Sequence, residues 1–118
     1  MDSSLIEKYE IVFREKLLIF QGGHPSRKVK IAETNNIYLS RFLIDWRDVE
    51  MINEALLPGI EAVLRGEIHE FETGSDRFLV LVDPLFTVFY IENTDDYPKV
   101  ATIDFRNIVA GWRDYLVS

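Results

Sequence analysis

The fold is decided by residues 67–91, EIHEFETGSDRFLVLVDPLFTVFYI. Apolar and β-branched residues are separated there by short clusters of turn residues, the pattern of successive β-strands. The predicted strands and turns are Glu67 to Thr73, Gly74-Ser75-Asp76, Phe78 to Val82, Asp83-Pro84 and Phe86 to Ile91. Because connections this short cannot form parallel crossovers, we predict an antiparallel meander.

The middle strand of the meander, Phe78-Leu79-Val80-Leu81-Val82, does not alternate between apolar and polar residues. A continuous apolar run indicates a strand that is covered on both faces. A layer of helices accounts for one face. The N-terminal segment, the central helices or another protein chain would have to cover the other.

A helix is predicted to close the chain after a polar loop at Asn93 to Pro98 and a short extended stretch at Lys99 to Ala101. Thr102 is its expected N-cap, and Asp104 lies in the first turn, where the helix dipole favours a negative charge. One stripe of the helix is apolar, Phe105, Ile108, Val109, Trp112 and Leu116, and we expect Arg106, Asn107, Arg113 and Asp114 to face away. Burial of this stripe requires that the helix lie on the sheet.

The central region also has helical periodicity. Its apolar residues are Val49, Ile52, Leu56, Ile60 and Val63, with Asp45 or Asp48 as the cap. Pro58 removes a backbone donor and clashes with the preceding turn, so we expect a kink or two short helices that meet at Leu57-Pro58. Gly66 is the expected stop.

The N-terminal segment, residues 4–20, allows two interpretations. Ser4 to Glu7 has capping-box spacing, and Leu5, Tyr9, Val12 and Phe13 share one helical face. Tyr9, Ile11 and Phe13 also alternate with polar residues, and Leu17 to Phe20 then forms a second strand after a turn at Arg14-Glu15-Lys16. We favour the strands. Beyond a loop at residues 21–26 we predict strands at Lys28 to Ala32 and Ile37 to Ile44, with a turn at Thr34-Asn35-Asn36.

These elements define an α+β protein: a mostly antiparallel sheet with a C-terminal amphipathic helix and a Pro-kinked central helical region packed on it. A length of 118 residues, 47% of them hydrophobic, fits one domain over residues 1–118. The chain contains no cysteine, so we expect no disulfide, and the longest apolar run is too short to span a bilayer. The expected compartment is the cytoplasm, with no membrane contact.

Acidic residues outnumber basic ones by 20 to 13, which gives a net charge of −7. A negative protein repels phosphate backbones, so no nucleic-acid partner is expected. Arg27, Lys28 and Lys30 form a local basic cluster, expected to be a solvated loop. The overall charge suits a basic protein partner, or solubility alone.

No group of residues predicts a catalytic, cofactor or metal site, and we expect that the protein is not an enzyme. His24 lies in a Gly-Pro loop near Ser26, without the frame of a serine nucleophile. On a strand, His69 would point away from Glu70 and Glu72 and lie at the edge of the core. Gly22-Gly23 lacks the other residues of a nucleotide loop. Trp112 is predicted to be in the core, and Trp46 to be partly exposed but in a packing role.

The second half of the chain resembles small bacterial immunity proteins of polymorphic toxin systems, including contact-dependent inhibition. The matching residues are Gly66-Glu67, Glu72-Thr73-Gly74, the strands through Ile91, Ile103 to Ile108, and Trp112 to Leu116. The resemblance implies an antiparallel sheet with helices, a cytosolic location and a toxin domain as partner. It carries no catalytic residues.

Three functions follow as hypotheses. The first is an immunity-type inhibitor whose acidic patch is steered onto a basic toxin. The candidate partner-binding residues are Glu67, Glu70, Glu72 and Asp76 at the first hairpin, and Glu92, Asp95, Asp96 and Tyr97 on the next loop. The second is a structural or adaptor domain that self-associates as a homodimer through a sheet face or edge. The third is a small enzyme or ligand-binding domain centred on His24 or His69.

Overall fold

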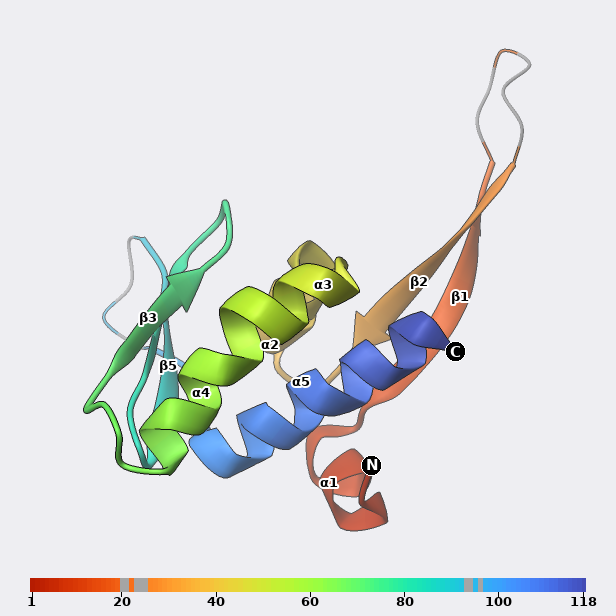
Figure 1. The fold of residues 1–118 in the computed structure, drawn as a ribbon. Helices are drawn as coiled ribbons and strands as arrows, with labels where there is room; N and C mark the ends of the chain where they lie inside the picture. The colour runs from red at the N-terminus through yellow and green to blue at the C-terminus, as the bar shows by residue number, and fades with distance from the viewer. Residues whose placement is uncertain (20–21, 23–25, 93–94, 96) are drawn as a thin grey trace.

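The protein has an α+β fold, seen in a computed structural model that describes residues 1–19, 22, 26–92, 95 and 97–118 (Figure 1). Two antiparallel sheets and several helices make up the described chain. In chain order the elements are α1 (Ser3–Tyr9), β1 (Val12–Leu18), β2 (Arg27–Glu33), α2 (Ile37–Asp45), α3 (Val49–Met51), the π-helix η1 (Ile52–Leu56), α4 (Leu57–Leu64), β3 (Phe71–Gly74), β4 (Leu79–Val82), β5 (Phe86–Tyr90), β6 (Lys99–Ala101) and α5 (Thr102–Val117).

The predicted meander is confirmed, and it forms a four-stranded antiparallel sheet in the order β3-β4-β5-β6. Its first strand is shorter than predicted, since β3 begins at Phe71 rather than at Glu67. Phe71 pairs with Val82, the last residue of β4. Residues 67–70 would need partners beyond Val82. There the chain turns at Asp83-Pro84, so no strand is available to pair with them.

The helices cover one face of this sheet, which we call the inner face. It presents Val80, Val82, Phe89 and Val100 to the helices, all at most 2% exposed. The opposing residues come from α2, the central helices and α5, and the fully buried ones are Leu39, Phe42, Leu43, Ile52, Leu56, Ile60, Val63, Phe105, Ile108, Val109 and Trp112. At roughly 1.5–3 kcal/mol for each large apolar side chain, this burial is the main stabilisation of the fold.

The closing helix α5 packs as predicted on its apolar stripe, with Leu116 only partly buried at the far end. The role expected for Thr102 is different. Ala101 is the residue before the helix, and Thr102 is fully buried, with its hydroxyl donating a 2.7 Å hydrogen bond to the carbonyl of Asp83. Thr102 therefore fastens α5 to the β4–β5 turn. Of the residues expected to face away, only Asp114 is exposed, and Arg106, Asn107 and Arg113 are half-buried.

The predicted interruption at Pro58 is confirmed and takes the form of a π-helical segment. The N–H of Leu57 bonds to the carbonyl of Ile52, five residues earlier. Pro58 then lies in the first turn of α4, at a position where its missing N–H costs little. Asp48 caps the region through the N–H groups of Glu50 and Met51, and Gly66, with a φ of 76°, follows its end as predicted.

The N-terminal segment contains one helix and one strand, so the favoured pair of strands is wrong. Asp2, not Ser4, caps α1 by accepting from the N–H of Ser4 at 2.8 Å. β1 then runs straight through Arg14-Glu15-Lys16, where we expected a turn, because Glu15 is paired with Lys30 of β2. The predicted strand at Lys28 to Ala32 is confirmed as part of β2.

The strand predicted at Ile37 to Ile44 is instead the helix α2. The side chain of Asn36 accepts from the N–H groups of Tyr38 and Leu39, so the expected turn is a helix cap. Leu39, Phe42 and Leu43 lie on one face of the helix and are fully buried. Within the described residues, no helix is long and apolar enough to cross a membrane.

Candidate partner-binding surface

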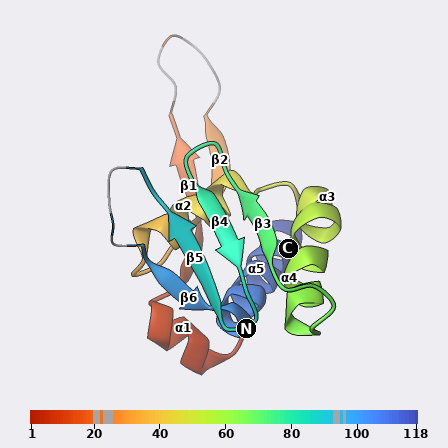
Figure 2. The same cartoon turned by 90° about the vertical axis from the view of Figure 1, so that its left-hand side faces the viewer.

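The face of the four-stranded sheet that points away from the helices is uncovered by any described element (Figure 2). The strand register places on it Glu72, Leu79, Leu81, Phe86, Val88, Tyr90 and Lys99, and we call these residues, with Tyr97, the outer face. We predicted that both faces of Phe78–Val82 would be covered. Only the inner one is: Val80 and Val82 are fully buried, whereas Leu79 is 41% exposed.

The centre of the outer face is apolar and aromatic. Phe86 and Tyr97 are each 39% exposed, and Leu81, Val88 and Tyr90 are half-buried. The rings of Tyr90 and Tyr97 lie 4.7 Å apart between centroids, and the Lys99 ammonium lies 4.3 Å from the centroid of the Phe86 ring. A contiguous apolar patch of this kind, rimmed by polar residues, is typical of interaction surfaces.

Acidic side chains gather at one end of the outer face. In an antiparallel meander the β3–β4 turn and the β5–β6 connection lie at the same end of the sheet. Asp76, on the first, and Glu92 and Asp95, on the second, are all exposed there. The structure thus places three of the predicted partner-binding residues at the end of the sheet where Tyr97 lies. Asp96 lies outside the described residues.

The remaining predicted residues are separated from this acidic end. Glu72 lies on the outer face itself, opposite Leu81. Glu70 and Glu67 lie near the other end of the sheet, in the connection between α4 and β3, and not on a strand. Glu67 accepts a 2.9 Å hydrogen bond from Arg65, which lowers the pKa of its carboxyl group. Glu67 is therefore already partnered within the chain.

Two depressions flank the sheet, and sequence reasoning did not predict either. One, of about 220 Å³, is lined by Asp45, Trp46, Arg47, Asp48, Met51, Gly74, Ser75 and Asp76. The other, of about 520 Å³, is a wide groove lined by Lys8, Tyr9, Asn35, Asn36, Ile37, Tyr38, Pro98 and Lys99. The first joins residues from two distant segments of the chain and the second joins residues from three, so no local pattern could have predicted them.

Trp46 has the packing role predicted for it, at the wall of the smaller depression. It is half-buried, its ring lies 5.8 Å from that of Phe42, and its indole N–H donates a 2.9 Å hydrogen bond to the carbonyl of Gly74. The indole of Trp112 is fully buried, as predicted, and donates to the carbonyl of Trp46.

The two histidines are not brought into a reactive arrangement in the described part of the chain. His69 is exposed in the α4–β3 connection, so its predicted place at the core edge of a strand is wrong. His24 lies outside the described residues. Among residues 1–19, 22, 26–92, 95 and 97–118, no three His, Asp or Glu side chains are grouped so that they could hold a metal ion.

The basic cluster lies on a strand rather than in a loop. Arg27 and Lys28 are exposed on β2, but Lys30 is half-buried and donates to the backbone oxygens of Tyr115 and Leu116 in α5 and of Ser118 just after it. Lys30 is therefore a structural residue.

Comparisons with protein-family models, with curated proteins and with solved structures gave no match.

Proposed function

We propose that this protein is an immunity-type inhibitor that binds a basic toxin domain through the outer face and neutralises it by covering its surface. The observation that carries the proposal is the uncovered apolar centre of the sheet, with exposed carboxylates at one end of it. Aromatic and aliphatic side chains that lose their remaining exposure on binding supply most of the affinity of a protein interface. The outer face offers three such side chains at 39–41% exposure, Leu79, Phe86 and Tyr97.

The charges around the outer face support the second part of the proposal, that the partner is basic. Asp76, Glu92 and Asp95 are exposed at one end of it, and the whole chain has a net charge of −7. Such a surface attracts a basic partner over several ångströms and accelerates its encounter, and this attraction weakens with added salt. The same charges also contribute to specificity, because they attract basic proteins and repel acidic ones.

Capture of the partner from the source cell tests the proposal directly. The bait is the full chain, compared with a Leu79→Thr/Phe86→Thr variant and with the control Ile6→Ala, whose side chain is 38% exposed on α1. Threonine retains the strand preference of the sheet residues. We expect one basic protein to be retained by the wild type and the control and to bind the double variant at least tenfold more weakly. Equal capture by all three baits contradicts the proposed surface.

The inhibitory role has its own test. The captured protein is expressed in a bacterial host alone and with the wild-type chain. We expect growth arrest without the chain and growth with it, and no rescue by the Leu79→Thr/Phe86→Thr variant. A captured protein without toxicity contradicts the inhibitory role, although it leaves the binding surface intact.

The charge contribution is tested by reversal of two carboxylates. Glu72→Lys/Glu92→Lys should slow association with the captured protein and weaken its salt dependence, without a change in the circular dichroism spectrum. The matched control is Glu50→Lys, an exposed carboxylate on α3. An association rate equal to that of the control would remove these two residues from the interface.

Self-association is a second candidate function, and the same uncovered face favours it. An adaptor domain could bury this face against another copy of the chain. Tight association of the pure protein, with no partner captured from the cell, would favour this function over the first.

A further inference from the structure

The hairpin formed by β1 and β2 extends away from the rest of the molecule (Figure 1). Its base is anchored, because Phe13 packs against Trp112 at 5.2 Å between ring centroids and Lys30 binds the last turn of α5. The strand pairs beyond this base are Lys16 with Val29, Leu17 with Lys28 and Leu18 with Arg27. We call residues 16–19 and 26–29 the arm.

The arm carries apolar side chains that are largely exposed to solvent. Leu17 is 52% exposed and Ile19 is 76% exposed, the latter being the most exposed of the large hydrophobic residues in the described chain. β1 and β2 pair only with each other among the described strands. A two-stranded ribbon is marginally stable in water by itself, so these aliphatic side chains and free strand edges favour a contact with another surface.

The arm has the opposite charge to the rest of the chain. It carries Lys16, Arg27 and Lys28 and no acidic residue, whereas the remaining residues hold 20 acidic and ten basic side chains. None of the three cations forms a salt bridge within the described part of the chain. A surface that suits the arm must therefore be both apolar and acidic.

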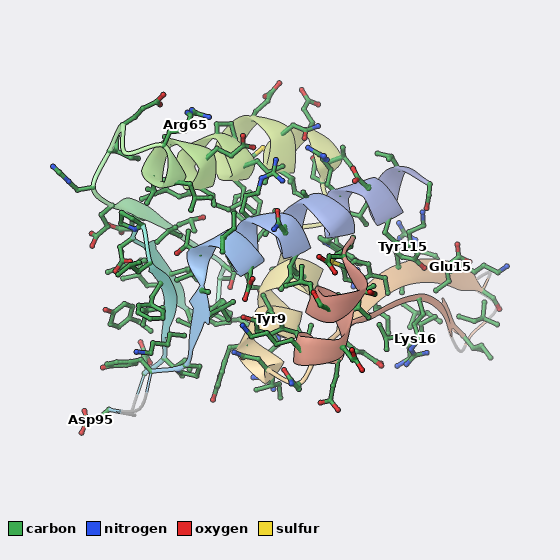
Figure 3. All side chains as sticks on the ribbon, turned by 90° about the horizontal axis from the view of Figure 1, so that it is seen from below. Tyr9, Glu15, Lys16, Arg65, Asp95 and Tyr115 are labelled. Carbon is green, nitrogen blue, oxygen red and sulfur yellow. The ribbon has the colours of Figure 1, made fainter. Side chains whose placement is uncertain are left out.

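The outer face and the end of the sheet beside Tyr97 have this combination. The exposed apolar residues are Leu79, Phe86 and Tyr97, the charged residues on the face are Glu72 and Lys99, and the exposed carboxylates of Glu92 and Asp95 lie at its end. In one molecule the arm cannot reach this face, because the two lie at opposite ends of a chain that extends over 51 Å. Figure 3 places Lys16, on the arm, and Asp95, beside the outer face, on opposite sides of the helices.

We infer that the arm of one copy binds the outer face of a second copy. Leu17 and Ile19 pack on the apolar centre of the face, and Lys28, which pairs with Leu17 and therefore shares its side of the hairpin, meets the carboxylates. The inference rests on the proposed use of the outer face as a docking surface, and it adds a second occupant that competes with the toxin domain. Because each chain supplies one arm and one face, the contact joins unlike surfaces.

Sedimentation of two complementary variants tests the inference. The arm variant is Leu17→Thr/Ile19→Thr and the face variant is Leu79→Thr/Phe86→Thr, with Ile6→Ala as the control. We expect the wild type and the control to associate as concentration rises through the micromolar range, and each variant alone to associate at least tenfold more weakly. An equimolar mixture of the two variants should form a 1:1 complex, because one supplies an intact arm and the other an intact face.

Three outcomes would overturn the inference. They are a wild type that keeps the mass of one chain at every concentration, an arm variant that associates like the wild type, and a variant mixture that stays dissociated. If the face variant fails to fold, Glu72→Lys, an exposed change on the same face, replaces it. A wild type that does not self-associate but captures a basic protein through the outer face would remove this inference and leave the proposed function standing.

Discussion

The indole N–H of Trp112 donates a 2.8 Å hydrogen bond to the backbone carbonyl of Trp46, and the indole N–H of Trp46 in turn donates a 2.9 Å bond to the carbonyl of Gly74. The two bonds connect α5, the α2–α3 junction and the end of β3, segments that are 28 and 66 residues apart in the chain. Both donors are indole groups on rings that pack in or against the core. The position of the outer face relative to the helices therefore depends in part on this pair.

Trp46→Phe should destabilise the protein by about 1–2 kcal/mol, because a smaller aromatic ring still packs at this half-buried position but the carbonyl of Gly74 loses its indole donor. Urea denaturation measures the change, and Trp112, the remaining tryptophan, reports unfolding by its fluorescence. Trp112→Phe should cost more, since it also leaves a cavity in the core. An unchanged urea midpoint for Trp46→Phe would show that its hydrogen bond contributes nothing.

The stability of the protein should fall above pH 10, and Tyr9 is one cause. Burial, together with the 2.7 Å hydrogen bond that its hydroxyl donates to Asp104, raises the pKa of Tyr9 above its ordinary value near 10. The folded chain thus holds this proton more tightly than the unfolded chain. The resulting stabilisation is complete below pH 10 and is lost as the pH rises towards the higher pKa of the folded state.

Tyr9→Phe should therefore lower the free energy of unfolding at neutral pH by about 1–2 kcal/mol and flatten its decline at alkaline pH. Thermal unfolding across a pH series gives both quantities. Tyr38→Phe is the control, because the hydroxyl of Tyr38 forms no hydrogen bond to a described residue. Equal alkaline slopes for wild type and Tyr9→Phe would contradict the prediction.

Gly59→Ala should destabilise the protein by about 1–3 kcal/mol through overpacking, although alanine is the better helix former. A Cβ at Gly59 would overlap the ring of Phe71, where β3 approaches α4. Gly111→Ala is the comparison, because its nearest neighbour would be the flexible side chain of Met1, with Sδ at 3.1 Å. Thermal unfolding measures the effect. We expect the melting temperature of Gly59→Ala to be lower than that of the wild type, and the melting temperature of Gly111→Ala to be unchanged or higher.

Lys30→Met should loosen the contact between the base of the hairpin and α5. The Nζ atom donates to the carbonyls of Tyr115, Leu116 and Ser118 at 2.9, 3.3 and 2.7 Å, where a cation also suits the helix dipole. Methionine retains the aliphatic stem and removes the donors. Amide hydrogen exchange should become faster in residues 113–118 and in β2, and it should stay unchanged in β4 and β5. If residues 113–118 and β2 exchange at the same rate in the variant as in the wild type, this role of Lys30 is contradicted.

The elements predicted correctly from the sequence carry strong local signals. Short turns at Gly74 and at Asp83-Pro84 allow only an antiparallel meander between β3 and β5. The stripe on α5 repeats over 16 residues, long enough for its period to be read without ambiguity. Pro58 and Gly66 act through their own backbone restrictions, which do not depend on distant residues.

The errors lie in short apolar runs whose period is ambiguous. Residues 37–44 suited a strand locally, but Asn36 caps them as a helix, and Leu39, Phe42 and Leu43 are buried against distant segments. β1 exists as a continuous strand because β2, which begins nine residues after β1 ends, supplies its hydrogen-bond partners. No local feature of Arg14-Glu15-Lys16 indicates that pairing.

From its sequence alone this protein is an acidic α+β chain with a three-strand meander and a closing amphipathic helix, because turn chemistry and side-chain periodicity act over a few neighbouring residues. Only the tertiary structure decides which face of the meander stays uncovered. Leu79 and Val80 are equally apolar neighbours, and their different exposure arises from helices that reach one side of the sheet and leave the other open. Asp76, Glu92 and Asp95 lie at the same end of the sheet because two connections far apart in the chain both turn there.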